Sequence, residues 1–525
     1  MEKALNHYQY RYFFVIHGKK TSKARQGDFF VSVIYPFIRI VWPFVVTYIY
    51  NMLSNFIFAI PYCNDNTNKM KKPKLSFGQI WNLSFGFLGV QIGYSLQNSN
   101  TSSILQSMGA DLSHLSYFWL AAPLAGLIVQ PIVGMFSDGT WTRFGRRIPY
   151  ILGGSLISTL ALLLMPNCPV LLAFAPLVMG ALILLFMDLS FNITMQPFRA
   201  LVTDMLDDSQ KTQGFVIQTF LINLGAVIGA LLPLVMTWFG VSDAPVEGGV
   251  SRHIAYSYYA GGAILLLTVL VTSFKVKEYP PEQFSQYNDA ADEVHDTEHP
   301  GFWSLMKNIP ATMYQLGITQ FFSWAALFLM WNYLKPLISA SFIDPSGASV
   351  NMGGAETWTG VLNAVYPVPA CIASIFMAKI AAKYGNKSVY AVTLFLGALG
   401  FLGLTMITDK YMMMLPMIGI GIAWAGILAM PYSILSRAID PRSSGAYMGI
   451  FNFTITIPQI MMGLLGGSIV KAVKTTVLDG RTYDALSIVE KVQADSVSAA
   501  WMIGLAAAFM LVASVSVYFI KEKKA

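Results

Sequence analysis

Long apolar stretches separated by short polar gaps run along the chain from Phe77 almost to its end. Each is close to the ~18–20 residues that an α-helix needs to cross the hydrocarbon core of a bilayer. We count twelve such stretches, at roughly residues 77–98, 113–136, 148–165, 170–195, 213–238, 254–274, 311–334, 357–381, 388–407, 411–432, 445–470 and 497–520. The pattern predicts an all-α, polytopic membrane protein.

The longest polar interruption divides these stretches into two sets of six. It covers residues 275–304 and mixes prolines, acidic residues and histidines. Transporters built from two related halves have this organisation. We therefore expect a six-helix half at 70–274, a cytoplasmic linker at 275–304 and a second six-helix half at 305–525, arranged around a central cavity.

The basic residues indicate an orientation. If the first stretch begins inside the cell, cytoplasmic segments from Lys69 onward carry 20 Lys and Arg residues, and outer segments carry 7. Because cytoplasmic loops carry the Lys/Arg excess, we expect a multi-pass protein of the plasma (inner) membrane with both termini cytoplasmic.

Residues 1–69 do not fit the twelve-span pattern, because their one apolar stretch is interrupted by prolines. Met70 is followed at once by Lys-Lys-Pro-Lys, a good cytoplasmic lead into the first span. We expect residues 1–69 to be an extension that an over-long gene model has added. The alternative is an accessory membrane anchor.

Composition narrows the function classes. The chain is 55% hydrophobic and 12% charged, against roughly 25% charged in soluble domains. The net charge of +7 does not indicate nucleic-acid binding, since the basic residues lie in short loops. No His-Glu-x-x-His or phosphate-loop motif occurs, and three scattered cysteines predict neither a disulfide framework nor a metal site. We expect no enzyme activity and no cofactor.

The gap after the second stretch carries the most specific motif. It reads Gly134-Met-Phe-Ser-Asp138-Gly-Thr-Trp-Thr-Arg143-Phe-Gly145-Arg146-Arg147-Ile-Pro149, and residues 378–387 repeat it weakly without the acidic residue. Charge-assisted hydrogen bonds between helix ends are strong enough to hold one side of a transporter closed. We expect a cytoplasmic gate here. The alternative is a basic anchor that only sets the topology.

A carboxylate inside the fourth stretch is the strongest candidate for chemistry. Asp188, Asn192 and Gln196 follow at i, i+4 and i+8 and therefore share one helix face. An ionisable residue within a membrane span is costly and marks function by default. We expect Asp188 to be a proton-coupling site, the alternative being a structural carboxylate paired with a cation on another helix. Arg199 lies about 16 Å further along the helix and is assigned to the gate.

Other polar and aromatic residues recur inside the spans of both halves. Amides offer donors and acceptors that fit sugar hydroxyls, although helix-to-helix hydrogen bonding is the alternative for each of them. With Asn192 and Gln196, the substrate-binding candidates are Gln91, Tyr94, Asn98, Gln218, Gln320, Trp324, Asn363, Tyr366, Asn452 and Gln459.

Three blocks of sequence resemble the sucrose-type branch of the glycoside–pentoside–hexuronide:cation symporters, within the major facilitator superfamily. They are residues 119–149, with the gate motif; 188–204, with Asp188, Asn192 and Pro197-Phe-Arg199; and 449–467, with Asn452 and Pro458-Gln459. The resemblance implies twelve helices and uptake of a disaccharide glucoside such as sucrose or maltose with H⁺. It also implies that Asp188 is the proton-coupling carboxylate.

We therefore expect a secondary active symporter whose partners are a sugar, H⁺ and the lipid bilayer, without nucleic acid, and which functions as a monomer. The alternatives are a Na⁺-coupled glycoside transporter and a non-transporting sugar sensor of the same fold.

Overall fold

The computed structural model describes residues 72–108, 112–171, 176–242, 244–245, 250–288, 301–346, 348–478 and 482–522. All of them belong to one compact unit, Phe58–Ala525. The expectation that residues 1–69 are an extension falls outside the described residues.

The first half of the chain forms six long helices, one for each expected span. They are α4 (Phe77–Ser107), α5 (Leu112–Gly139), α6 (Ile148–Leu164), α8 (Pro176–Met205), α9 (Asp208–Trp238) and α10 (Arg252–Lys275). A short 3₁₀ turn, η2 (Met165–Asn167), and the one-turn α7 (Cys168–Leu171) follow α6.

The second half again provides six spans, two of which are broken. They are α13 (Ala311–Ser339), α14 (Met352–Val365) with α15 (Pro367–Tyr384), α16 (Asn386–Met406), α17 (Met414–Leu435), α18 (Ser444–Phe451) with α19 (Phe453–Leu478), and α20 (Ile488–Ser516). Pro367 has no N–H to continue the helical ladder, which explains why α14 ends just before it. Two short helices, α11 (Pro281–Asn288) and α12 (Phe302–Lys307), lie in the segment between the halves.

The all-α prediction with twelve spans is confirmed. Nine of the described helices or broken helix pairs are long and apolar enough to cross a membrane. Both α4 and α13, which are outside that set, carry several amide and hydroxyl side chains that lower their hydropathy. Apart from isolated backbone bridges, the described residues contain no β-strand.

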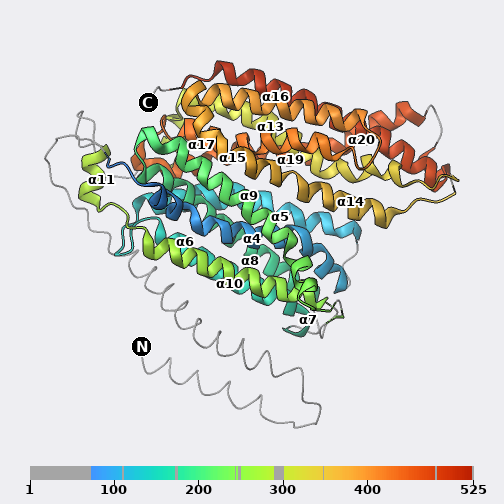
Figure 1. Cartoon of the computed structure of the whole chain (residues 1–525), viewed down its shortest axis with the longest axis horizontal. Coiled ribbons are helices and arrows are strands. Elements are labelled where there is room, and N and C mark those ends of the chain that lie inside the picture. Colours follow the sequence, from blue (N-terminus) through green and yellow to red (C-terminus); the bar gives the residue numbers. More distant parts are fainter. Residues whose placement is uncertain are drawn as a thin grey trace, which may run out of the picture. The chain divides into compact units, whose positions relative to one another are not determined.

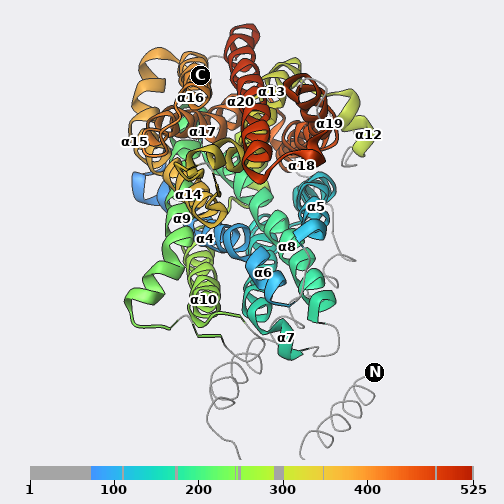
Figure 2. The same cartoon turned by 90° about the vertical axis from the view of Figure 1, so that its right-hand side faces the viewer.

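The helices form two bundles, one from each half of the chain (Figures 1 and 2). In the first bundle α4 packs against α9 and α10, and α8 packs against α5 and α6. In the second, α13 packs against α20, and α16 packs against α17 and α20. The bundles meet where α5 and α8 contact α18, and where α9 contacts α15 and α17.

The structure extends α8 ten residues beyond the expected end at 195, to Met205. Hydropathy marks only the part of a helix that suits the bilayer, whereas the helix continues until its hydrogen bonds are terminated. Here the chain turns at Asp207, whose side chain accepts from the Ser209 N–H at 3.1 Å and caps α9. The extension places Asp204 in the last turn of α8.

Candidate functional site

Arg147, which precedes α6, is fully buried among acidic and hydroxyl partners. Its Nη2 lies 2.5 Å from Asp138 Oδ1 at the end of α5, and its Nε lies 2.8 Å from Asp204 Oδ2 at the end of α8. Nη1 donates to Ser137 Oγ, and Nη2 donates to Ser444 Oγ at 3.0 Å. The end of the helices where this cluster lies is called the arginine end below.

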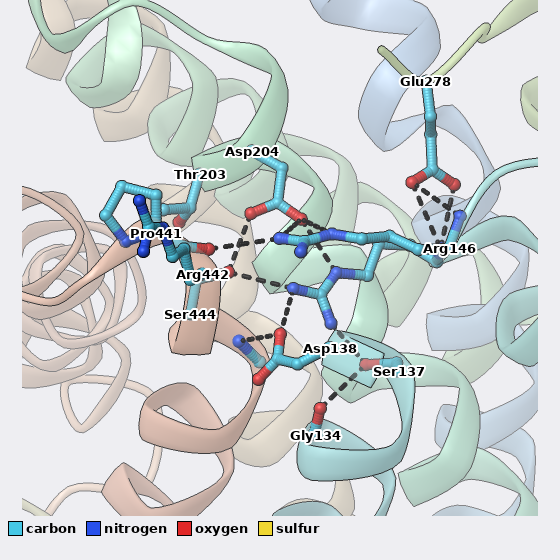
Figure 3. A network of polar contacts seen from close by, with 12 residues as sticks. Gly134, Ser137, Asp138, Arg146, Thr203, Asp204, Glu278, Pro441, Arg442 and Ser444 are labelled. Carbon is cyan, nitrogen blue, oxygen red and sulfur yellow. Dashed lines mark hydrogen bonds and ion pairs between the residues drawn. The ribbon is translucent and has the colours of Figure 1, made fainter. Parts of the chain in front are cut away.

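Arg146 shares Asp204 with Arg147. Its Nη2 lies 2.8 Å from Asp204 Oδ2 and donates to the Pro441 carbonyl at 3.1 Å. Ser444 Oγ donates to the other Asp204 oxygen at 2.7 Å. Figure 3 shows Asp204 between Arg146 and Ser444, with Asp138 close by. One carboxylate therefore joins two arginines of the first half to the second half.

The start of α18 docks on Asp138. The N–H groups of Gly445 and Ala446 donate to the two Asp138 carboxylate oxygens at 3.0 and 2.7 Å. These N–H groups belong to the first turn of a helix and have no partner within it, and the helix dipole favours negative charge there. Gln196 adds another contact between the halves by donating from Nε2 to the Gly445 carbonyl.

The two backbones approach closely at Gly134 in α5 and Gly445 in α18. A Cβ atom on Gly134 would collide with the Gly445 carbonyl, and one on Gly445 would meet Arg147 and Asp138. The glycine in the sequence motif is therefore required for contact between the halves.

Gly145 serves a different purpose. Its φ of +109° lies in the left-handed region that favours glycine, and a Cβ atom there would collide with Glu278. Glu278 accepts from the backbone N–H groups of Arg146, Arg147 and Ile148 at 2.9–3.1 Å, and so caps α6. Burial raises the pKa of Glu278 above its ordinary value, although these N–H groups and Arg147 oppose the rise.

A second cluster of polar contacts lies at the same end and also joins the two halves, with its carboxylate in the second half. Glu522, just after α20, accepts from Asn386 Nδ2 at 2.7 Å and pairs with Arg437 Nη1 at 3.3 Å. Arg437 Nη2 donates to Thr212 Oγ1 at 2.8 Å, and Lys211 Nζ donates to the Ser436 carbonyl at 2.8 Å. The start of α9 thus docks on the second half, as the start of α18 docks on the first.

Asp188 lies far from both clusters. It is 1% exposed, roughly 18 Å from the start of α8 and roughly 25 Å from its end. Its Oδ1 accepts from Gln97 Nε2 of α4 at 2.5 Å, and its Oδ2 has no hydrogen-bond partner among the described residues. No cation pairs with this carboxyl in the described part of the chain, so the partner that a structural carboxylate would need is not seen.

Two amides extend the site towards α5. Asn192 Nδ2 donates to the Asp188 carbonyl at 2.8 Å, and Gln130 Nε2 donates to Asn192 Oδ1 at 2.7 Å. The sequence interpretation included Asn192 but missed Gln97 and Gln130. Both are amides inside apolar spans, and this was the signal that could have identified them.

The remaining first-half candidates are dispersed. Tyr94 packs edge-on against Phe191 at 5.8 Å, beside Asp188. Asn98 is exposed, and Gln91 is half-buried against Gly225 of α9. Gln218 is buried and donates to the Phe198 carbonyl at 3.3 Å, within the same bundle.

In the second half, aromatic side chains cluster. Trp324 and Trp331 of α13, Trp424 of α17 and Tyr366 pack edge to face, with ring centroids 5.5–6.3 Å apart. Trp331 and Trp424 are only half-buried.

The other second-half candidates are amides. Gln320 is buried and accepts from Tyr390 OH at 3.0 Å, and Asn452 donates to the Gly126 carbonyl of α5 at 3.0 Å. Asn363 and Gln459 are half-buried.

The two remaining gate candidates lie outside the Asp138–Asp204 cluster. Arg143 is exposed and sits over the Phe144 ring at 4.7 Å. Arg199 lies over the Tyr432 ring of α17 at 4.5 Å and thereby contacts the second half.

Two six-helix bundles that meet through buried polar contacts, with a lone carboxyl inside one of them, have the architecture of a secondary transporter. The family model described as Major Facilitator Superfamily matches residues 83–463. The chain belongs to this superfamily. It is a multi-pass membrane protein and a transporter rather than an enzyme.

The curated proteins that resemble this chain in sequence are named as sugar transporters. The chain is 24% identical over 431 residues to sucrose transport protein SUC4 of Arabidopsis thaliana, covering 72% of this chain and 81% of that protein. It is 26% identical over 280 residues to the general alpha-glucoside permease of Schizosaccharomyces pombe, covering 50% of this chain and 48% of the permease.

Solved structures share the fold. The proton:xylose symporter XylE matches with a TM-score of 0.60 at 12% identity, over 85% of this chain and 96% of that one. FucP, a Major Facilitator Superfamily transporter in its outward conformation, matches with a TM-score of 0.59 at 14% identity, over 85% and 99%.

The close approach of α5 and α18 gives a first testable prediction. Gly134→Val should force the two helices apart and destabilise the protein by ~1–3 kcal/mol, the usual cost of overpacking a tight contact. Thermal unfolding of the purified protein measures the loss. Gly504→Val is the matched control, since a Cβ atom at Gly504 meets nothing within 4 Å. Equal unfolding midpoints for the two variants would contradict the predicted contact.

The cap on α6 gives a second prediction. A raised pKa means that folded Glu278 binds its proton more tightly than the unfolded chain does, so its contribution to the free energy of unfolding is largest below the ordinary value of 4.5 and falls as pH rises through the raised pKa. Glu278→Gln cannot ionise and should lack this decline.

Thermal unfolding between about pH 4 and about pH 8 measures this decline in stability. Glu356→Gln, at an exposed glutamate, should keep the wild-type profile. If Glu278→Gln keeps the wild-type profile as well, the Glu278 carboxyl is not the source of the decline in stability.

Proposed function

We propose that this protein imports a disaccharide α-glucoside, such as maltose or sucrose, by symport with H⁺. The names of two relatives, a sucrose transport protein and a general alpha-glucoside permease, support the substrate class. One observation carries the proposal: the carboxyl of Asp188 is buried, pairs with no cation among the described residues, and accepts a hydrogen bond there only from the amide of Gln97.

Coupling follows from the cost of burying charge. A carrier that alternates between outward and inward states must pass through a state in which its central site is closed to water on both sides. An ionised Asp188 opposes this movement, because an unpaired charge within a span is expensive. Protonation removes the charge, so that the loaded carrier reorients and the proton gradient drives accumulation of sugar.

The unpaired polar atoms near the middle of the bundles suit a polyhydroxylated ligand. Among the buried unpaired atoms of the described residues are two acceptors in the first half, Asp188 Oδ2 and Gln130 Oε1, and two donors in the second half, Gln320 Nε2 and Trp324 Nε1. A sugar hydroxyl can pair with both acceptors and donors, since it donates one hydrogen bond and accepts others. The aromatic cluster around Trp424 offers faces for the apolar side of a pyranose ring.

The arginine end is proposed to be cytoplasmic, because the Lys/Arg excess is on that side. Both termini then lie in the cytoplasm, and the protein resides in the plasma (inner) membrane and acts as a monomer. We assign the gate to Asp138, Arg146, Arg147, Gly134 and Gly145, with Arg199 as an additional contact. The halves at 70–274 and 305–525 would separate at this end when the carrier opens inward, joined by the linker at 275–304.

The coupling role makes a third prediction. Asp188→Asn mimics the protonated side chain permanently, so it should abolish pH-driven accumulation while keeping downhill exchange of the same sugar. Uptake of radiolabelled maltose and sucrose into vesicles, with and without a pH gradient, measures both. An Asp188→Asn protein that still concentrates sugar in response to the gradient would rule out Asp188 as the coupling site.

Two further measurements in the same uptake experiment distinguish the competing functions. Omitting Na⁺ should leave pH-driven uptake unchanged, whereas a Na⁺-coupled transporter would lose it. A protein that binds the sugar without moving it under any gradient would be a sensor.

The gate makes a fourth prediction. Asp138→Asn removes one charge from a buried pair, and losing one partner of such a pair costs ~3–5 kcal/mol. Because the network stabilises one conformation rather than the sugar, the maximal rate should fall about tenfold or more, with a smaller change in KM.

The matched control is Asp344→Asn, at an exposed carboxylate whose hydrogen bonds are to Ser346 of the same loop. It should transport nearly as well as the wild type. An Asp138→Asn protein with normal rate and lost affinity would refute the gate role.

A further inference from the structure

Two oxygen atoms at the Asp188–Gln97 contact have no hydrogen-bond partner among the described residues. Gln97 is fully buried on α4, and its Nε2 donates to Asp188 Oδ1. Its other polar atom, Oε1, and the other carboxyl oxygen, Asp188 Oδ2, are both buried and unpaired among the described residues. Leaving buried acceptors without donors is unfavourable, and native structures rarely tolerate it without a reason.

The orientation of this amide follows from its partner. An ionised carboxylate only accepts hydrogen bonds, so the amino group of Gln97 must point towards it. A carboxyl group and a primary amide have edges of the same length, each with two polar atoms. Once Nε2 is bonded to Oδ1, the unbonded edge of the pair consists of Oε1 and Oδ2, which are both acceptors. A single proton between them would supply the missing donor.

We propose that Gln97 is the positioning residue that holds Asp188 in its protonated form, through a cyclic pair of hydrogen bonds. This inference rests on the proposed function, in which Asp188 carries the coupled proton. A proton from the outer medium binds Oδ2, and the resulting O–H donates to Gln97 Oε1 while Nε2–H still donates to Oδ1. On the cytoplasmic side the same proton leaves to water, and the carboxylate keeps only the Nε2–H bond.

Among the described residues, no other carboxyl, histidine or basic group contacts the Asp188 carboxyl. Tyr94 of α4 lies beside Asp188. Asn192 donates to the Asp188 backbone carbonyl rather than to its carboxyl, and Gln130 donates to Asn192. Along α8, Arg199 is about 16 Å away and Asp204 about 24 Å away. Cys168 of α7 lies towards the opposite end of the helices. The titratable groups on the neighbouring α6, α9 and α18 lie near the arginine end: Tyr150, Asp208, Lys211 and Tyr447. On α5, Asp138 lies at that end, and His114 and Tyr117 lie in the first two turns, at the opposite end of the helix.

The cyclic pair explains why protonation would prepare the carrier to reorient. The protonated pair is neutral, and both its edges are satisfied without water. The deprotonated pair is charged and leaves two acceptors unpaired, which only water or the hydroxyl groups of a ligand can satisfy. Gln97 thus increases the free-energy difference between the protonated and the deprotonated Asp188 carboxyl.

Infrared difference spectroscopy of the protein in phosphatidylcholine vesicles tests the pair. The carbonyl stretch of a protonated carboxyl rises in frequency when its hydrogen bonds are lost. The band that appears on acidification and is missing in Asp188→Asn reports on Asp188. We expect Gln97→Met, an uncharged variant of similar size, to shift this band to higher frequency, and Gln97→Leu is used in its place if that variant does not fold.

Gln130→Met is the matched control. It makes the same substitution at a buried amide that does not touch the carboxyl, and it should leave the band in place. An unshifted band in Gln97→Met or Gln97→Leu overturns the cyclic pair but leaves Asp188 as the proton site. A wild-type protein with no band that depends on Asp188 overturns the proposed function itself.

Discussion

A charge that is buried away from water has to be paired or neutralised, and the carboxylates of this protein satisfy that constraint in two ways. At the arginine end Asp138 contacts Arg147, Asp204 contacts Arg146 and Arg147, and both carboxylates have further donors. Asp188 contacts one amide and no cation in the described part of the chain. The first arrangement is suited to holding helices together, and the second to gaining and losing a proton.

The paired carboxylates take their partners from both halves. Asp204 is joined to the second half through Ser444, and Asp138 through the first turn of α18. In the proposed gate, the bonds that hold the arginine end together are therefore the bonds that an opening movement has to break. The close contact of Gly134 with Gly445 makes the interface sensitive to small displacements, because packed surfaces favour a few discrete arrangements over continuous deformation.

The sequence predicted the helices well, because the length and hydropathy of a membrane span are local properties. It also identified Asp188 and the arginine motif, since charges inside or beside apolar segments are conspicuous. Glu278 was missed as the cap of α6, since it lies 131 residues from Arg147 along the chain. Gln97 was missed because nothing in its local sequence distinguishes it from the neighbouring amides.

The amide side chains that were predicted to bind substrate show the same limit of sequence-based prediction. Gln196, Gln218 and Asn452 were predicted to bind substrate, and the structure shows each donating to a backbone carbonyl of another helix. Asn192 was predicted on the same grounds, and it does lie at the Asp188 site. Helical periodicity gives the face of a side chain but not its partner, which depends on how the other helices are placed.

Proton binding measured together with sugar binding tests the account most directly. If Asp188 is the coupled site, sugar must bind more tightly to the protonated protein, and by linkage sugar must increase proton binding. Adding sugar to purified protein in weakly buffered solution should then take up to about one proton per sugar from the medium, and Asp188→Asn should take up none although it still binds sugar. Equal proton uptake by the wild type and Asp188→Asn would contradict the account.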